Sequence, residues 1–207
     1  MAVPSARTPQ GHEIQFGTNH VGHALLTHLL LPLLLRTAAL PAADVRIVNL
    51  TSMGHRMAPG PEGIILDQER LARDYAPWPR YGQSKLANIL FTQGLRRRYP
   101  QIVSVAVHPG VILTDLYQSQ RQSNVFVKYG IKALGGLVMG DVKEGAKNQL
   151  WACVAPRGEL MAGAAEGKGV YWVPVGSKGW GSKFVGDEAL ADRLWEWTQG
   201  EFKKFGY

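Results

Sequence analysis

Apolar positions along the chain follow two periods, which predict helices alternating with short buried strands. Helical spacing, with an apolar residue every three or four positions, runs over residues 11–36, 80–99, 141–155 and 187–205, and more briefly over 67–74. Short apolar runs rich in β-branched residues, which indicate strands, occupy 45–50, 102–107 and 169–175. This alternation is typical of βαβ crossovers, so the pattern predicts an α/β fold with a doubly wound parallel sheet. Pro174 places the third strand at an edge of the sheet or marks its end.

The apolar segment 24–35, ALLTHLLLPLLL, raises the question of a membrane span. It is short, lies inside the chain, and contains His28 and Pro32. A spanning helix needs roughly 20 predominantly apolar residues, and a signal sequence would stand at the N-terminus behind basic residues. We therefore predict a buried helix here and no transmembrane segment.

Length and composition fit one soluble domain. The chain has 207 residues, of which 45% are apolar and 19% are charged. That is enough for one sizeable core and too little for two. The single cysteine, Cys153, excludes an intrachain disulfide, which favours a reducing compartment and predicts a cytoplasmic location.

A formal net charge of +7 raises the question of a nucleic-acid partner. The only run of basic residues, 96–98, stands where the second long helix should end, so its charges face the negative end of the helix dipole. No aromatic-interleaved basic patch accompanies it, and we predict no nucleic-acid partner. His20 and His23 are three positions apart, but no carboxylate follows at ligand spacing, so no metal site is predicted.

Candidate chemistry gathers where the predicted strands end. The first two strands are followed by Ser52 and by Pro109-Gly110. Tyr81 opens the helix between them, and Lys85, four residues later, shares its helix face. Ligands of open α/β sheets bind beyond the carboxyl ends of the strands. These residues are therefore expected to converge on one edge of the sheet.

Tyr81 and Lys85 form either an acid–base couple or the start of an amphipathic helix. A phenol has a pKa near 10, too high for ready proton exchange at neutral pH, and a nearby ammonium favours the phenolate and lowers that pKa. The hydroxyl of Ser52 is suited to hydrogen-bond a substrate carbonyl oxygen. The plainer alternatives are a turn cap at Ser52, a satisfied core amide at Asn19, and an exposed helix start with a solvated lysine.

Five ordered pieces of the sequence carry a resemblance to a known family. They are FGTNHVGH (16–23), RIVNLTSMGH (46–55), YGQSKLANILF (81–91), HPGVILTDL (108–116), and GVYWVP followed by LWEW (169–197). Over nearly its whole length the chain resembles a short-chain dehydrogenase/reductase, of the branch similar to retinol dehydrogenases and WW-domain-containing oxidoreductases. The resemblance implies a Rossmann-like fold and leaves the plainer alternatives weak.

The resemblance implies roles for four catalytic residues. Tyr81 would be the proton donor or acceptor, and Lys85 would lower its pKa and hold the nicotinamide ribose. Ser52 would orient the substrate oxygen. Asn19 would anchor a water in a proton relay.

The resemblance also implies an NADP cofactor, with NAD as the alternative. The residues that would contact it are Tyr81, Lys85, Ile112 and Thr114. The family's glycine-rich turn, Thr-Gly-x-x-x-Gly-x-Gly, which binds the pyrophosphate at a helix N-terminus, is missing. Glycine groups at 135–140, 163–169 and 176–181 all follow the catalytic helix, and we interpret them as loop glycines.

Residues 1–4, MAVP, resemble the residues that come directly after the family's Asn-Asn-Ala-Gly motif. The chain is therefore expected to be a single partial domain, 1–207, without the first four strands of the fold. Either it is a shortened oxidoreductase, or it is a catalytically inactive remnant that acts as a binding or interaction protein. The strand at 45–50 would then be an exposed sheet edge, through which a homodimer or another association is expected.

The function implied by the resemblance is NAD(P)-dependent interconversion of a hydroxyl and a carbonyl group. Aromatic and aliphatic residues at 115–140 are suited to form a lid over the site, and the Trp/Pro segment at 75–79 adds to its apolar surface. An apolar lining with few charges predicts a hydrophobic small-molecule substrate. Similar chains are frequent in fungal secondary metabolism, and the resemblance implies such a role.

Overall fold

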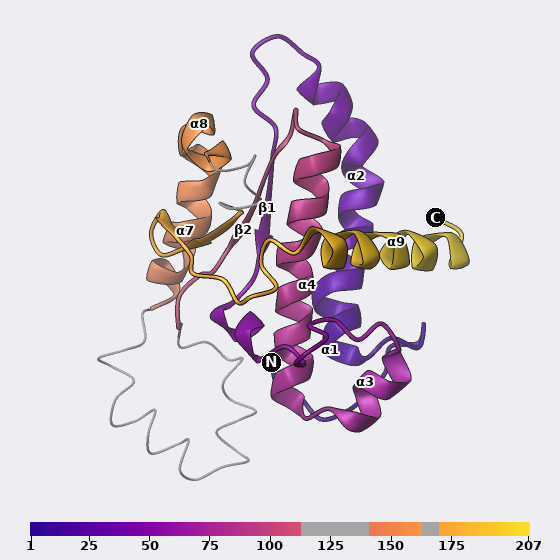
Figure 1. The fold of residues 1–207 in the computed structure, drawn as a ribbon. Helices are drawn as coiled ribbons and strands as arrows, with labels where there is room; N and C mark the ends of the chain where they lie inside the picture. The colour runs from indigo at the N-terminus through magenta and orange to yellow at the C-terminus, as the bar shows by residue number, and fades with distance from the viewer. Residues whose placement is uncertain (113–140, 163–169) are drawn as a thin grey trace.

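The computed structural model describes residues 1–112, 141–162 and 170–207, and it has a mainly parallel sheet between helices (Figure 1). Its strands are β1 (Arg46–Leu50), β2 (Val103–Val107), β3 (Tyr171–Val173) and β4 (Ser177–Lys178), in the order β1-β2-β3-β4. The first three run parallel, and β4 runs antiparallel to β3. The predicted α/β class is therefore confirmed. β3 ends directly before Pro174, and β1 is one edge of the described sheet.

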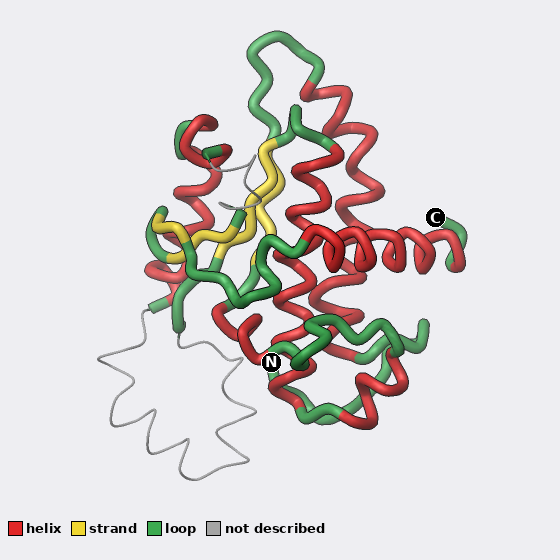
Figure 2. Tube along the Cα trace, viewed as in Figure 1, coloured by secondary structure: helices red, strands yellow, loops and turns green. Residues whose placement is uncertain are grey.

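Helices cover both faces of this sheet (Figure 2). On one face lie α4 (Pro77–Arg98), α2 (Gly22–Ala38) and α9 (Glu188–Lys204), and on the other lie α7 (Val142–Val154) and α8 (Arg157–Met161). The central strand β2 explains why both layers form. Its odd-numbered valines pack with Ala152 of α7, whereas Ala106 packs with Ile89 of α4. A strand buried on both faces is apolar at nearly every position, as the sequence pattern indicated.

The helix α4 is the central support of the larger core. Proline occupies its first turn, where a missing N–H has no cost, and three arginines occupy its last turn. Arg98 donates to Asp192 of α9 at 2.9 Å and stacks on Trp195, and Arg96 donates to the Leu160 carbonyl. The run of basic residues therefore has structural partners within the fold.

The first long helix differs from its prediction. It is continuous from Ile14 to Ala38 through α1 (Ile14–Phe16), the π-helical turn η1 (Gly17–Val21) and α2. By length and composition it would suffice to cross a membrane, and the expectation that no segment spans one stays a prediction. The expectation of a buried helix is wrong for one stripe: Leu29 and Leu33 are 56% and 52% exposed.

The physical reason is the outer position of α2. On its inward side, Leu31 packs against Val45 and Ile102, the residues directly before β1 and β2. Among the described residues, nothing covers the opposite stripe of leucines.

The long connection after β1 carries a 3₁₀ turn, η2 (Met53–Met57), and the helix α3 (Gln68–Asp74), which the sequence pattern indicated at 67–74.

Candidate functional site

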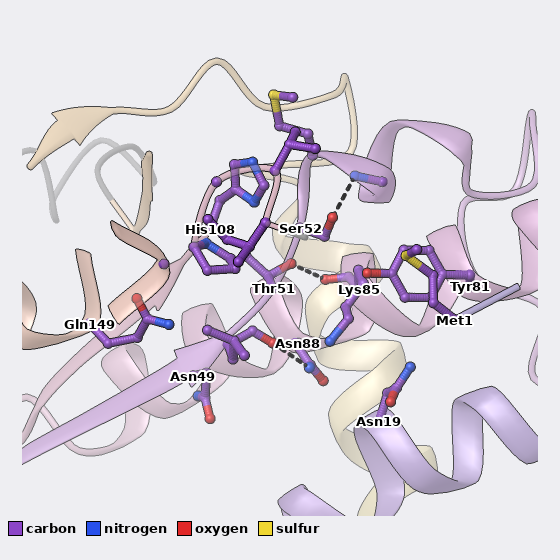
Figure 3. A pocket seen from close by; sticks show the side chains of 18 of the residues that line it. Met1, Asn19, Asn49, Thr51, Ser52, Tyr81, Lys85, Asn88, His108 and Gln149 are labelled. Atoms are coloured by element: carbon purple, nitrogen blue, oxygen red, sulfur yellow. Dashed lines mark hydrogen bonds between the residues drawn. The ribbon is translucent and has the colours of Figure 1, made fainter. Parts of the chain in front are cut away.

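A cavity of about 1030 Å³ lies at the carboxyl ends of β1 and β2, where α4 begins. Of the residues with predicted site roles, the structure brings Asn19, Ser52, Tyr81, Lys85 and Ile112 to its lining. Figure 3 shows the first four converging from three different elements. Thr114 lies outside the described residues.

Tyr81 and Lys85 stand on the first turns of α4, one turn apart. Tyr81 is 6% exposed, and Trp78 packs edge-on against its ring with the centroids 6.0 Å apart. The Lys85 ammonium lies 5.8 Å from the centre of the Tyr81 ring. Burial lowers the pKa of Lys85 from its ordinary 10.5 to about 8. The spacing in the sequence thus produces a largely buried ammonium beside a buried phenol.

Ser52 follows β1 and caps the turn η2. Its Oγ accepts a hydrogen bond from the backbone N–H of Gly54 at 3.0 Å. A hydroxyl that accepts in this way retains its own proton for donation. Ser52 is therefore a turn cap, as the plainer alternative held, and still presents a donor at the cavity.

Two glycines set how closely η2 approaches α4. A Cβ on Gly54 would lie 2.7 Å from Cε1 of Tyr81 and 3.3 Å from Oγ of Ser52. A Cβ on Gly82 would lie 2.6 Å from the backbone nitrogen of Ala58. Because both residues are glycines, the turn that carries Ser52 can pack directly against the ring of Tyr81.

We expect Gly82→Ala to lower the free energy of unfolding by about 1–3 kcal/mol, because the new methyl group meets backbone atoms that cannot rotate away. It should also reduce turnover, since η2 must move away from Tyr81. Urea unfolding measures the first effect. Gly158→Ala is the control, because a Cβ there meets nothing within 4 Å; equal stability of the two variants would contradict the close approach.

Asn19 lies in the π-helical turn η1, a type of local widening that is frequent at functional sites. Its Nδ2 donates to Oγ of Ser84 at 3.0 Å, and that hydroxyl donates to the Tyr81 carbonyl at 2.7 Å. Figure 3 shows the side chain on the same side of the cavity as the Lys85 ammonium. Asn19 is thus tied to α4 directly before Lys85.

Two polar side chains that the sequence reasoning missed attach β1 to α4. Oγ1 of Thr51 donates to the Lys85 carbonyl at 2.7 Å, and Nδ2 of Asn88 donates to the Leu50 carbonyl at 3.0 Å. Both are neighbours of the motif residues in the sequence. Thr51 stands one residue before Ser52, and Asn88 stands about one helical turn after Lys85. These positions were the sequence signal that could have identified them.

The far wall of the cavity is the turn after β2. Gly110 has a φ of +94°, which favours glycine. The buried Asn148 of α7 fixes this turn: its Nδ2 donates to the His108 carbonyl at 2.8 Å, and its Oδ1 accepts from the Gly176 N–H at 3.1 Å. Ile112 packs directly on α7, since a Cβ on Gly145 would lie 2.8 Å from its side chain. No sequence signal marked Asn148.

Comparisons with known proteins identify relatives over nearly the whole chain. Short-chain dehydrogenase/reductase drtF of Aspergillus calidoustus is 35% identical over 216 residues, which cover 99% of this chain and 66% of that protein. The chain belongs to the short-chain dehydrogenase/reductase family. Retinol dehydrogenase 12 of Mus musculus is 32% identical, over 94% of this chain and 56% of its own. No protein-family model matches the chain.

A solved structure supports the fold independently. The crystal structure of an uncharacterized protein from Mycobacterium paratuberculosis aligns with a TM-score of 0.66 at 30% identity, over 98% of this chain and 63% of that one. The chain therefore spans less than two thirds of the length of each of these three proteins. The Rossmann-like class is confirmed.

The glycine groups outside the site are accounted for in part. Gly176, Gly179 and Gly181 approach Trp151, Tyr171 and Val185 too closely for a Cβ, so they are packing glycines of the β3–β4 turn and the loop after it. The groups at 135–140 and 163–169 lie outside the described residues. Within the described part, no three His, Cys, Asp or Glu side chains gather as a metal site would require, and the absence of a metal stays a prediction.

Proposed function

We propose that the protein is an NADP-dependent oxidoreductase that interconverts a hydroxyl and a carbonyl group on a hydrophobic small molecule. The observation that carries the proposal is the convergence of Tyr81, Lys85 and Ser52 on one cavity, from α4 and from the end of β1. NAD remains the alternative cofactor, and the choice of NADP rests on the family resemblance alone. A role in secondary metabolism has the same support.

Each of these residues has a distinct part in the proposed chemistry. The hydroxyl of Tyr81 gives a proton to the substrate oxygen during reduction and takes it back during oxidation. The Lys85 charge favours the phenolate form. The free proton of Ser52 Oγ holds the same oxygen in place. Asn19, whose Nδ2 is bound to Ser84, keeps Oδ1 as the acceptor for a relay water.

The described residues fit the nicotinamide–ribose end of the cofactor. A largely buried ammonium is costly unless an acceptor reaches it, and ribose hydroxyls would supply that acceptor at Lys85. Ile112 and the Gly110 turn would line the nicotinamide side. When bound, the nicotinamide ring supplies or accepts a hydride. Thr114 keeps its proposed cofactor contact as an expectation.

The expectation of an apolar substrate has support from the described walls of the cavity. Met53 and Met57 of η2 and Trp78 of α4 line it near Tyr81, and all three are partly exposed. Methionine and aromatic side chains bind apolar molecules of varied shape. The predicted lid at 115–140 lies outside the described residues.

The test is turnover of a substrate panel by the protein expressed from the complete reading frame of its gene, with NADPH and NADH in parallel. We expect bulky aliphatic and aromatic aldehydes or ketones to be reduced faster than sugar phosphates or charged acids, because the rim near Tyr81 is apolar. Preference for the charged compounds would contradict the substrate class. Binding of an apolar ligand with no turnover under any cofactor would instead favour the inactive binding protein.

Location and assembly are further proposals. A cytoplasmic location rests on the single cysteine, whereas the helix Ile14–Ala38 is apolar enough to be tested for membrane attachment. Association of two chains is proposed at β1, the edge of the described sheet, where Leu50 is 44% exposed.

A further inference from the structure

A buried histidine behind the serine turn links two parts of the chain that are 127 positions apart. We propose that His55 is a positioning residue: it holds the Ser52 turn against the loop that follows β4, and so keeps the Ser52 hydroxyl aligned with Tyr81. The catalytic consequence rests on the proposed function, whereas the link itself rests on hydrogen bonds of the fold.

Both ring nitrogens of His55 are used. Nδ1 lies 2.8 Å from the Ser52 carbonyl oxygen, which also accepts from the His55 backbone N–H at 3.0 Å. On the other side, the backbone N–H of Ser182 donates to Nε2 at 3.1 Å. A carbonyl can only accept and a backbone N–H can only donate. The two bonds therefore coexist only in the neutral ring that carries its proton on Nδ1.

The next residue of η2 makes a second connection to the same loop. The guanidinium of Arg56 donates to the backbone carbonyl of Trp180. The ring of Tyr171, on β3, packs edge-on against His55 with the centroids 5.0 Å apart. The loop at 180–182 is thus attached to η2 through two successive side chains, of which only His55 also reaches the catalytic serine.

Several titratable or charged groups surround His55. Arg56 neighbours it on η2, His108 stands at the end of β2, and Lys85 belongs to the helix that packs against η2; the phenol of Tyr171 faces it from β3. Burial lowers the pKa of His55, and the Arg56 charge acts in the same direction, while the Ser52 carbonyl opposes them. Burial also lowers the pKa of His108 to about 4. A second proton on His55 would set N–H against N–H at Ser182.

The serine turn lies so close to Tyr81 that any movement of the turn changes its contact with the tyrosine ring. Gly54 separates Ser52 from the Tyr81 ring, and a Cβ there would lie 2.7 Å from that ring. A rotation of η2 would therefore change the position of the serine hydroxyl relative to the phenol. Misplacement of a catalytic group by about 1 Å can cost about 10²-fold in rate.

The experiment compares three variants of the full protein that separate the two bonds. His55→Phe keeps the ring contact with Tyr171 and loses both hydrogen bonds. His55→Asn places an amide near Nδ1, within reach of Ser52, and His55→Gln places an amide oxygen near Nε2, within reach of Ser182. The control is His12→Phe, a buried histidine whose Nε2 bonds Glu201 at 2.8 Å and which is not part of the cavity lining.

Two measurements decide the outcome. Hydrogen exchange at the Ser182 amide should be at least tenfold faster in His55→Phe and His55→Asn than in the parent, and should recover in His55→Gln. In steady-state assays, His55→Phe should lower kcat by about 10²-fold with little change in KM, whereas His12→Phe should not change kcat. If the Ser182 amide exchanges equally in the parent and in His55→Phe, the link is wrong. If exchange changes but kcat does not, the positioning role is wrong.

A third measurement tests the hydrogen-bond link independently of the proposed function. Imidazole ¹⁵N spectra of the parent should show His55 protonated on Nδ1 alone at pH 7, with no titration near the ordinary pKa of about 6.5. An inactive parent would refute the oxidoreductase activity and the catalytic part of the inference. The spectra and the Ser182 exchange would still confirm or refute the link.

Discussion

Tyr81→Phe is expected to lower kcat by about 10²–10⁴-fold, the usual contribution of a positioned general acid or base. The ring of Tyr81 fills the space between the Gly54 backbone and Trp78, and phenylalanine fills it equally well. What is lost is the hydroxyl that exchanges a proton with the substrate oxygen. Stability and cofactor affinity should change little, because the packing and the Lys85 ammonium remain. Stopped-flow or steady-state reduction assays with the preferred ketone measure the loss.

The matched control for this variant is Tyr75→Phe. Tyr75 also bears a hydroxyl with a cationic neighbour, since Arg70 lies 3.4 Å from its oxygen, but it stands after α3 and away from the cavity lining. Its kcat should equal that of the parent. Turnover by Tyr81→Phe within a factor of a few of the parent would remove Tyr81 from the role of acid and base.

The elements that the sequence predicted share one property: their pattern is set by burial against a neighbouring layer. β2 is buried on both faces and α4 carries the larger core, so both left strong apolar signals. β4 has two residues and exists only through its pairing with β3, so no periodicity could reveal it. The exposed stripe of α2 was mispredicted because its apolar pattern is stronger than its burial in the fold. A leucine-rich sequence indicates burial, but only the neighbours in space decide which leucines are covered.

The candidate site divides in the same way. Ser52, Tyr81 and Lys85 could be found because local order places them: Tyr81 and Lys85 share a helix face, and Ser52 stands at the end of a strand, where parallel sheets bind ligands. Two long-range supports of the site, His55 and Asn148, could not be found. His55 meets Ser182, and Asn148 meets His108 and Gly176, across separations that only the closed fold defines. The π-helical turn that carries Asn19 also depends on how η1 packs, and not on a residue type.

Lys85 offers the second large effect, and here the expected change is a gain in stability. Its pKa falls from the ordinary 10.5 to about 8 because burial disfavours the charged ammonium. A shift of this size corresponds to about 3 kcal/mol of destabilisation by the buried charge. Lys85→Met keeps the length of the side chain and removes the charge. We therefore expect this variant to be more stable than the parent at pH 7, while its turnover falls, a trade-off frequent at active sites.

The direction of the pKa shift determines how the stability difference between Lys85→Met and the parent changes with pH. Below pH 8 both the folded and the unfolded parent hold the Lys85 proton, so the full penalty applies. Between pH 8 and 10.5 the unfolded chain holds more protons than the folded one, and the parent gains stability as the pH rises. The advantage of Lys85→Met should thus shrink by about 3 kcal/mol across this window. Urea unfolding at pH 7, 8.5 and 10 measures it.

The control for the other titrating groups is Lys143→Met, a change at an exposed lysine of α7. Its stability relative to the parent should stay nearly constant over the same pH range, so the difference between the two variants isolates Lys85. A constant offset for Lys85→Met, parallel to that of Lys143→Met, would mean that the ammonium is well solvated. Lys85 would then be a surface lysine at the start of a helix, and solvent would screen its charge, so that it would act only weakly on the Tyr81 phenol.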